Sequence, residues 1–383
     1  MKDTILFGNC QDTLKEFAPK SARTCVTSPP YYGLRDYGTA TWIGGDPNCN
    51  HRRDSKVKPE NCNTGHKNHD EMYGVGDAIY KTVCPKCGAI RQDSQIGLEE
   101  TPEQYIENLV NVFRSVRDVL TDDGTLWVNL GDSYYNYRPG KGQALVKQSV
   151  SKTKQDLPDE CNKRGNKLDG LKEKDLIGIP WMFAFAMRSD GWYLRQDIIW
   201  HKPNPMPESV RDRCTKSHEY IFLFSKNRKY YYDNEAIKEP AKDWGTRDRT
   251  NGKYHNEGTG LQPHSGLTKS YPTKNKRSVW SVTVKPYKEA HFATYPPDLI
   301  EPCILAGSEK GDTVLDPFMG AGTTAAVAKS LNRHYIGCEL NEGYGNLIQK
   351  RIQDYQPVNK PTQEPCINTV SYTHLTLPTS DLV

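Results

Sequence analysis

Long hydrophobic runs are missing from this chain. Its 383 residues contain no apolar stretch of about 18 residues, the length that a transmembrane helix needs, so we expect no membrane span. The amino terminus likewise lacks the apolar segment of a secretory signal peptide. A hydrophobic fraction of 36% and a mean hydropathy of −0.77 predict a core beneath a very polar surface. These absences favour a soluble intracellular protein.

A strong net charge is absent as well. The formal charge is only +4, which does not by itself indicate a nucleic-acid partner. The distribution is more informative, because Lys and Arg crowd within residues 138–174 and again within 238–288. Eleven cysteines in an intracellular chain are not expected to form disulfides, and most stand singly in apolar surroundings, as small core residues do.

The chain is organised around residues 27–32, a Thr-Ser-Pro-Pro-Tyr-Tyr segment. It follows the β-branched run 23–26, which predicts a buried strand, and two prolines then prevent the strand from continuing. Polar groups therefore gather at the carboxyl end of a strand, where open α/β sheets bind ligands. Such a site suits a planar ring with an amine: Ser28 and the Pro29 carbonyl accept its hydrogens, and Tyr31 stacks on its face. A proline pair alone is more often an ordinary turn.

Residues 44–97 differ in character from their surroundings. Gly, Asn, His and Lys dominate and apolar periodicity is absent, which indicates an insertion. Cys84 and Cys87 form a Cys-x-x-Cys-Gly turn, one half of a zinc ribbon, and the nearest pair to complete a tetrahedron is Cys49 with His51. A loop this polar needs a metal to stay ordered, so we expect a structural zinc; a disordered loop is the alternative. Three competing ligands remain open: Cys62, His66 and His69.

The rest of the chain alternates between helical and strand patterns, as a doubly wound sheet requires. A helix begins at Pro102 after the N-cap Thr101, and apolar residues recur at helical spacing up to Leu120. Residues 230–233 suggest an edge hairpin. The patterns further predict strands near 5–8, 23–26, 125–130, 191–200, 218–225, 313–316 and 333–339, and helices near 11–17, 177–188, 299–305 and 325–331.

Two further segments carry few apolar anchors. Residues 136–170 indicate a flexible basic loop, which is either solvated surface or a phosphate contact. Residues 234–290 are rich in Gly, Thr, Lys, Arg, Asn and His, side chains that contact phosphates and base edges. We expect this second segment to read a nucleic-acid target, with a disordered loop as the alternative.

The last third of the chain is a strand, a glycine loop, a helix and a second strand that ends in a carboxylate. Gly320 and Gly322 let the loop backbone approach a ligand, and Glu339 at the end of the second strand can accept both hydroxyls of a ribose. A lone Gly-x-Gly is weak evidence, and the third glycine of a dinucleotide site is missing. S-adenosylmethionine, which carries no phosphate, suits the shorter loop better than NAD.

Together the two motifs resemble the amino-group DNA methyltransferases. Residues 316–324 (Asp-Pro-Phe-x-Gly-x-Gly-Thr-Thr) look like the S-adenosylmethionine motif of that family, and residues 28–31 look like its catalytic Ser-Pro-Pro-Tyr motif. The catalytic motif comes first, as in the circularly permuted β group, where a target-recognition region lies between the two. The resemblance implies an α/β fold with a doubly wound, Rossmann-like methyltransferase sheet and, as in phage and bacterial members, a zinc-knuckle insertion. Serine in the first position is typical of enzymes that methylate N4 of cytosine; aspartate is typical of N6-adenine enzymes.

The resemblance also implies roles for individual residues. The target base is held by Ser28, Pro29, Pro30 and Tyr31. The cofactor is held, directly or through support of the loop, by Asp316, Phe318, Gly320, Gly322, Thr323 and Glu339. The metal ligands are Cys49, His51, Cys84 and Cys87. Asn9 stands where an acid often follows Phe-Gly, which leaves its own cofactor contact open.

The implied reaction is a direct methyl transfer. The target base flips out of the duplex, and its amine attacks the sulfonium methyl group in line without a cysteine nucleophile. The implied cofactors are S-adenosylmethionine and a structural zinc. The implied partners are double-stranded DNA and a cognate restriction nuclease. The protein is expected to be a monomer or a homodimer without membrane contact. Its expected location is the cytoplasm of a bacterial or phage-infected bacterial cell.

These assignments divide the chain into consecutive parts. Residues 370–383 look like one reading frame of a sequencing adaptor, so we expect an altered carboxyl terminus. The expected parts are a catalytic-motif segment (1–43), a zinc-knuckle insertion (44–97), a continued methyltransferase domain (98–233), a target-recognition region (234–290), a cofactor segment (291–357) and a tail (358–383).

Three other functions remain as alternatives. An N6-adenine methyltransferase of the same group is the nearest, because both bases present an amine. A zinc-ribbon nucleic-acid-binding protein with an inactive domain would be expected to have lost motif residues, yet Ser28, Tyr31 and Glu339 are present. A dinucleotide-dependent oxidoreductase lacks its third glycine.

Overall fold

A computed structural model of the chain describes residues 1–33, 39–51, 80, 83–135, 168, 170–241, 272–285 and 294–356. Within these ranges, no helix is both long and apolar enough to cross a membrane. Several predictions lie outside the described residues: the competing ligands Cys62, His66 and His69, nearly all of loop 136–170, and the tail 358–383.

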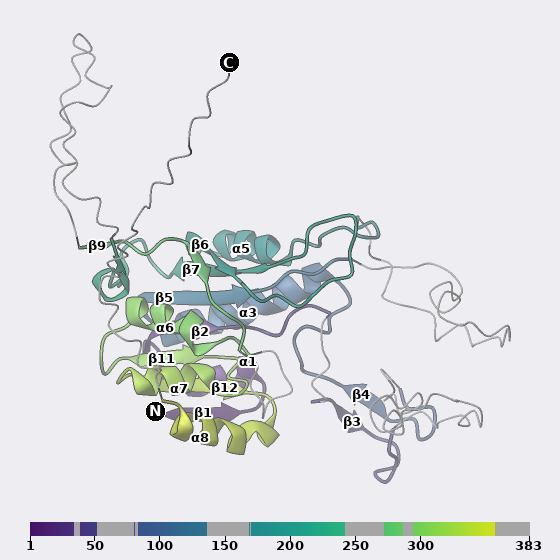
Figure 1. The fold of residues 1–383 in the computed structure, drawn as a ribbon. Helices are drawn as coiled ribbons and strands as arrows, with labels where there is room; N and C mark the ends of the chain where they lie inside the picture. Colours follow the sequence, from purple (N-terminus) through teal and green to yellow (C-terminus); the bar gives the residue numbers. More distant parts are fainter. Residues whose placement is uncertain are drawn as a thin grey trace, which may run out of the picture.

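An eight-stranded mixed sheet forms the centre of the fold (Figure 1). Its strands lie in the order β1 (Thr4–Phe7), β12 (His334–Glu339), β11 (Thr313–Asp316), β2 (Ala22–Thr27), β5 (Leu120–Leu130), β7 (His218–Ser225), β6 (Tyr193–His201) and β10 (Val279–Ser281). In this sheet β7 runs antiparallel to its neighbours β5 and β6, and the other pairs are parallel. The amino end of β7 therefore shares one edge of the sheet with the carboxyl ends of the other strands.

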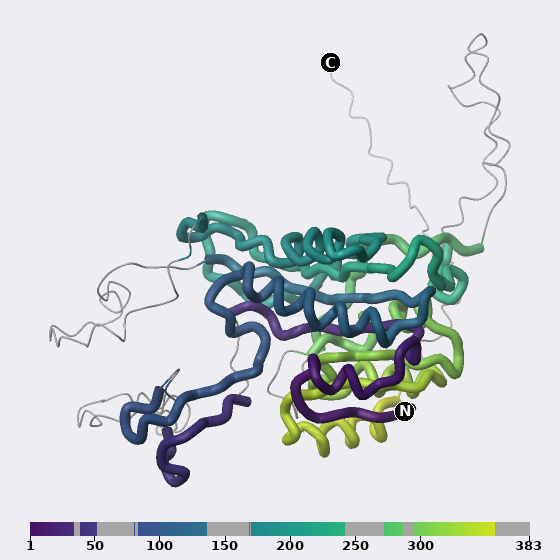
Figure 2. The backbone as a smooth tube through the Cα atoms, turned by 180° about the vertical axis from the view of Figure 1, so that it is seen from behind, coloured from purple at the N-terminus to yellow at the C-terminus, as the bar shows by residue number. Residues whose placement is uncertain are grey.

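Helices cover both faces of the sheet (Figure 1; Figure 2). Three of them share an apolar cluster with one face: α1 (Cys10–Thr13), α3 (Pro102–Val119) and α5 (Ile179–Ser189). Three share a second cluster with the other face: α6 (Pro297–Gly307), α7 (Thr323–Ser330) and α8 (Gly345–Asp354). Short 3₁₀ turns span Leu14–Glu16, Glu235–Ile237 and Glu342–Tyr344. This three-layer arrangement confirms the predicted α/β class.

Local signals account for α3. Thr101 caps the helix by accepting a 3.2 Å hydrogen bond from the Gln104 amide, and Pro102 occupies the first helical turn, where no amide donor is needed. Apolar residues recur every three or four positions, so one side of the helix faces the sheet and buries Tyr105 and Phe113 completely. The helix that the sequence predicts to begin at Pro102 is therefore confirmed.

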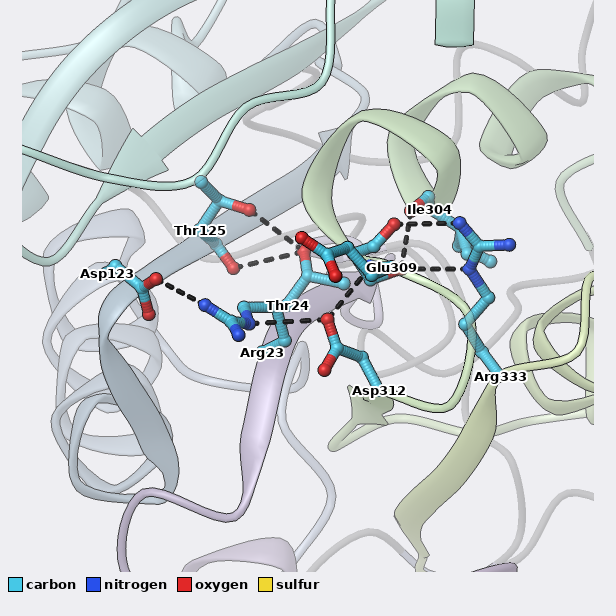
Figure 3. Close-up of polar contacts among 9 residues, drawn as sticks. Arg23, Thr24, Asp123, Thr125, Ile304, Glu309, Asp312 and Arg333 are labelled. Carbon is cyan, nitrogen blue, oxygen red and sulfur yellow. Dashed lines mark hydrogen bonds and ion pairs between the residues drawn. The ribbon is translucent and has the colours of Figure 1, made fainter.

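A polar network joins β2, β5 and the start of β11 at the amino edge of the sheet (Figure 3). Arg23 forms an ion pair with Asp123 and a second one, at 3.3 Å, with Asp312. Beside it, the hydroxyls of Thr24 and Thr125 lie 3.0 Å apart. These contacts connect neighbouring strands at the amino edge, which is the edge opposite the carboxyl ends of β2, β5 and β11.

Two stretches differ from the sequence-based expectation. Residues 230–233 form no strand, so the predicted edge hairpin is wrong; the Tyr231 amide instead donates to the Asp123 carbonyl at 2.9 Å.

Within 234–290, β10 extends the central sheet beside β6. Two small antiparallel pairs lie outside that sheet: β3 (Thr41–Ile43) with β4 (Ile90–Gln92), and β8 (Glu239–Pro240) with β9 (Thr273–Lys274).

Candidate functional site

A cavity of about 500 Å³ opens at the carboxyl edge of the sheet. This volume is in the range of pockets that enclose small molecules. Residues of both sequence motifs line it, together with the segment that follows β4: Ser28, Pro29, Pro30, Tyr31, Phe318, Gly320, Thr323, Glu339, Ser94, Gln95 and Ile96. Two motifs that are nearly three hundred residues apart in the chain therefore face the same space.

The predicted base-holding motif follows β2 directly. The prolines end the strand ladder, and the Tyr105 hydroxyl on α3 donates a 2.8 Å hydrogen bond to the Pro30 carbonyl, which fixes the turn. Within the described part of the chain no hydrogen bond engages the Pro29 carbonyl. Ser28 and Pro29 thus bring a hydroxyl and an open carbonyl acceptor to the cavity wall.

Contacts at the ring and at the hydroxyl fix the Tyr31 side chain. Its ring lies against the backbone of Gly131, where an added Cβ would approach Tyr31 Cε2 to 2.5 Å. Its hydroxyl donates to Glu219 Oε2 at 2.8 Å, and Asn129 Oδ1 lies 3.1 Å away. Burial and then the Glu219 carboxylate raise the pKa of Tyr31 well above its ordinary value, so the phenol remains a neutral donor. The ring is therefore a fixed surface on which a planar ligand can stack.

The glycine loop forms the other end of the cavity. Gly320 has a φ of +54°, and its amide donates a 2.7 Å hydrogen bond to Glu339 Oε2. The Asn341 amide donates to Glu339 Oε1 at 2.9 Å. Burial raises the pKa of the Glu339 carboxyl to about 7, although both amides oppose the shift. Each oxygen of a carboxylate can accept a further hydrogen bond, so Glu339 fits the two hydroxyls of a ribose.

Asp316, a predicted cofactor residue, lies behind the cavity wall. It is 1% exposed, and its carboxylate accepts hydrogen bonds at 2.6 Å from the hydroxyls of Thr27 and Thr324. The Phe318 amide and the Tyr295 hydroxyl donate at 3.0 and 3.1 Å. Burial raises the pKa of Asp316, and the four donors oppose that shift by favouring the charged form. Asp316 thus supports the loop from beneath.

Gly322, a predicted cofactor residue, does not line the cavity, whereas Asn9 does. Gly322 has a φ of +80° at the start of α7, and a Cβ there would lie 2.9 Å from Ile348 Cγ2, so the residue allows α8 to pack closely. Asn9 lines the cavity, but its side chain caps α1 by accepting from the Gln11 amide at 3.0 Å.

Sequence patterns did not identify three polar residues of the cavity. Asn129 and Glu219 belong to strands that the patterns predict as buried, and Lys202 begins a proline-rich loop after β6. Each of these residues is polar and lies at or next to a strand end, which is a feature visible in the sequence. Assigning them to the edge that carries Ser28 requires the order and direction of the strands, which periodicity does not provide.

The four predicted metal ligands lie together beside the β3–β4 hairpin. The ligand atoms of Cys49, His51, Cys84 and Cys87 all lie within 4.8 Å of one another. Cys49 Sγ is 3.7 Å from Cys84 Sγ, and Cys87 Sγ is 3.5 Å from His51 Nδ1. Ordinary zinc bond lengths in a tetrahedron require separations of about 3.8 Å between two sulfurs and about 3.6 Å between sulfur and nitrogen. The donor set and its spacing therefore fit a structural zinc site.

The hairpin connects this cluster to the cavity. Trp42 of β3 stacks on the His51 ring with centroids 4.2 Å apart and an interplanar angle of 14°. After β4 the chain returns along the cavity wall at Ile96, and the Gly97 carbonyl accepts a 2.8 Å hydrogen bond from the Gly33 amide. The segment next to the cluster thus packs against the turn that carries Tyr31.

Comparisons with known proteins agree with this geometry. The N6_N4_Mtase family, described as DNA methylase, matches residues 22–350. The chain is 39% identical over 350 residues to the type II methyltransferase M.XycI of Xanthomonas campestris pv. cyanopsidis, covering 91% of this chain and 87% of that protein. It is also 39% identical over 353 residues to the type II methyltransferase M.SmaI of Serratia marcescens, covering 91% and 90%.

A solved structure has a similar fold. The PvuII DNA methyltransferase (cytosine-N4-specific) superposes with a TM-score of 0.52 at 14% sequence identity, covering 94% of this chain and 88% of that one. The family match spans both motifs and every strand of the central sheet except β1. The chain therefore belongs to the DNA methylase family and is a DNA methyltransferase that depends on S-adenosylmethionine.

Proposed function

We propose that this protein methylates the exocyclic N4 amine of cytosine in double-stranded DNA. The observation that carries the proposal is that the Ser28–Tyr31 turn, the glycine loop at Gly320 and Glu339 at the end of β12 all line one cavity. Serine in the first position of this motif is typical of enzymes that methylate N4 of cytosine, so the motif resemblance supports cytosine rather than adenine as the target. The cytosine-N4-specific PvuII enzyme shares the fold at 14% identity, and this likeness concerns the architecture of the domain.

The glycine-loop end of the cavity would hold the cofactor, which supplies an electrophilic methyl group when bound. Glu339 would accept the ribose hydroxyls, while Phe318, Gly320 and Thr323 would line the rest of the site. Asp316 and Gly322 would act indirectly, by supporting the loop and its packing. The catalytic turn precedes the cofactor loop in the chain, which supports assignment to the circularly permuted β group.

The Ser28 end would hold the target base after it flips out of the duplex, at a cost of a few kcal/mol. The Ser28 hydroxyl and the Pro29 carbonyl would accept the two amine hydrogens, and Pro30 and Tyr31 would fix the ring plane. The delocalised amine lone pair is a poor nucleophile, so acceptors that favour a pyramidal nitrogen lower the barrier together with positioning. The amine nitrogen would form a bond to the methyl carbon while the S–CH₃ bond of the cofactor breaks and leaves a neutral thioether, and the nitrogen would then lose a proton to solvent.

The partners follow from this reaction. DNA contacts would come largely from the basic segments 136–170 and 234–290, most of which lie outside the described residues. The relatives M.XycI and M.SmaI are type II methyltransferases, which supports a cognate restriction nuclease as a functional partner in a restriction–modification system.

The Cys49–His51–Cys84–Cys87 cluster would bind a structural zinc. Four protein ligands leave no open coordination position, so the metal would contribute fold rather than methyl-transfer chemistry. Its role would be to hold the β3–β4 hairpin and the 93–97 segment against the cavity. A small polar element of this kind has little apolar area to bury, and metal binding can supply its folding free energy.

Transfer of a labelled methyl group to unmodified duplex DNA tests the site. The wild type, Ser28→Ala and Tyr31→Ala would be compared, with Cys214→Ser as a control at an exposed residue outside the cavity. We expect transfer by the wild type and the control, with a loss of at least about 100-fold in both motif variants. Unchanged transfer in Ser28→Ala would contradict the assigned site.

A further inference from the structure

Four polar residues lie in a row along the carboxyl edge, one from each of four adjacent strands. Thr27 pairs with Val128, so Ser28 lies beside Asn129. On the next two strands Glu219 pairs with Trp200, and Lys202 lies two residues beyond that pair. Asn129 pairs with Ile221, so Glu219 lies two residues beyond Asn129 in the strand direction, and Lys202 lies two residues beyond Glu219. The side chains of Glu219 and Lys202 therefore extend toward Ser28 from the outer rim of this edge. All four side chains line the cavity.

Glu219 holds the middle of this row together. Its Oε2 accepts from the Tyr31 hydroxyl at 2.8 Å and from Asn129 Nδ2 at 3.3 Å. Its Oε1 forms an ion pair with the Lys202 ammonium. One carboxylate, 15% exposed, therefore fixes both the stacking ring and the lysine, and we regard it as a positioning residue.

Lys202 retains donors that Glu219 does not use. Its ammonium lies over the Trp200 ring, 4.3 Å from the centroid, and Trp200 is itself anchored by a 2.8 Å hydrogen bond to the Val282 carbonyl. Among the described residues, Glu219 provides the hydrogen-bonding acceptor for this ammonium, which has three hydrogens. The side chain is 20% exposed and lines the cavity, so a remaining hydrogen can point to a ligand.

The proposed reaction fixes how a cytosine lies in this row. Its amine must face the glycine-loop side of the cavity, because the methyl donor binds there. A pyrimidine ring is about as wide as one gap between strands, so it extends from Ser28 toward β5 with its O2 acceptor on the side away from the amine. The long Lys202 side chain would cover the remaining distance from the end of β6. Adenine carries a C–H group in place of O2, so a donor at this point distinguishes the two bases.

We propose that the Lys202 ammonium, positioned by Glu219 and Trp200, donates a hydrogen bond to O2 of the flipped cytosine and so determines the base preference of the enzyme. This inference rests on the proposed function. It assigns discrimination to the far end of the cavity, while Ser28 recognises only the amine that both bases share.

The test compares two duplexes that differ at the target position. One carries cytosine at a site mapped with the wild-type enzyme; the other carries a 2-aminopyridine C-nucleoside, which keeps the amine and the adjacent ring nitrogen but lacks O2. For the wild type, removing O2 should lower kcat/KM by about 10- to 100-fold, the value of a charged hydrogen bond. Lys202→Met should lose a similar factor on cytosine and then differ by less than about threefold between the duplexes.

Two further measurements keep the outcome interpretable. Lys202→Arg should retain part of the O2 effect, and S-adenosylmethionine affinity, measured by calorimetry, should be unchanged in both variants. The proposal is overturned if Lys202→Met lowers kcat/KM on both duplexes by the same factor, since that pattern indicates a purely structural lysine. If the wild type produces N6-methyladenine, the cytosine assignment is refuted and this inference fails with it. That outcome is distinguished from a failure of the inference alone by the identity of the product.

Discussion

Thr27 Oγ1 donates a 2.6 Å hydrogen bond to Asp316 Oδ1, and this buried contact joins the last residue of β2 to the last residue of β11 across 289 positions of sequence. The next residue along each strand enters a functional loop, Ser28 in one case and Pro317 in the other. The spacing between the proposed base-holding turn and the proposed cofactor loop therefore depends on a contact that lies outside both proposed binding sites.

Thr27→Val tests this dependence. Removing one of the four donors to a buried carboxylate should lower the free energy of unfolding by about 1–3 kcal/mol and kcat/KM by roughly tenfold. The matched control is Thr24→Val, the same change on the same strand, where the hydroxyl bonds to Thr125 at the opposite edge. The control should lose stability but keep kcat/KM within about twofold. An equal loss of kcat/KM in both variants, measured on folded protein, would argue against the contact.

Gly131→Ala should disturb base binding without affecting the cofactor. The new Cβ would lie 2.5 Å from Tyr31 Cε2, and the ring cannot retreat because Glu219 holds its hydroxyl. We expect kcat/KM for DNA to fall by about 10- to 100-fold while the Kd for S-adenosylmethionine stays the same. In a Tyr31→Ala background the substitution should add little further loss; fully additive losses would show that Gly131 acts elsewhere.

Cofactor affinity should depend on pH through Glu339. Burial raises the pKa of its carboxyl to about 7, and ribose hydroxyls bind the charged form better. Affinity should therefore be flat above about pH 7 and fall by up to tenfold per pH unit below it, with proton release on binding. Calorimetry in buffers of different ionisation enthalpy measures both quantities. Glu339→Gln should bind weakly at every pH, and a flat profile in the wild type would be inconsistent with this role.

The raised pKa of Glu339 also makes the stability of the cofactor-free protein depend on pH, and this contribution to stability is greater at low pH, where we expect weaker cofactor affinity. The folded state binds the Glu339 proton more tightly than the unfolded chain does, because the folded pKa of about 7 exceeds the ordinary value of 4.5. The contribution of Glu339 to stability is therefore present below pH 4.5 and is lost as the pH rises through 7. Denaturant titrations of wild type and Glu339→Gln across this range should converge at low pH.

Metal analysis tests the cysteine–histidine cluster. Purified protein should contain one zinc per chain, and Cys84→Ser should lose it because the buried Cys84 sulfur is one of the four proposed ligand atoms. Hydrogen exchange should then increase within residues 39–51 and 83–97 but not in α6. Cys214→Ser, at an exposed cysteine outside the cluster, should keep the metal. A full zinc content in Cys84→Ser would exclude this ligand set.

The elements that sequence analysis predicted are those with local signals. Prolines at 29 and 30 mark a strand end wherever they occur, and the Cys84–Cys87 turn has the spacing of a metal knuckle in any fold. The helix α3 carries its cap and its periodicity within its own residues. The conformation of each of these segments is determined mainly by its own residues and their immediate neighbours in the chain.

The features that sequence analysis missed depend on strand order. Glu219 becomes a cavity residue because β7 enters the sheet in the reverse direction, which brings its amino end to the edge that carries Ser28. The resemblance assigned Asp316 to support of the cofactor loop, but the two hydroxyls that bind its carboxylate, those of Thr27 and Thr324, are identified only from the fold. The strand β10 is three residues long and too short for its alternation to stand out.

The most direct test of the account is the identity of the methylated base. Duplex DNA incubated with the purified protein and methyl-labelled S-adenosylmethionine would be digested to nucleosides and analysed by mass spectrometry, with Ser28→Ala and Tyr31→Ala in parallel. The account predicts labelled N4-methylcytosine from the wild type and its loss in both variants. Labelled N6-methyladenine would contradict the cytosine assignment, and an undiminished product from Ser28→Ala would contradict the proposed site.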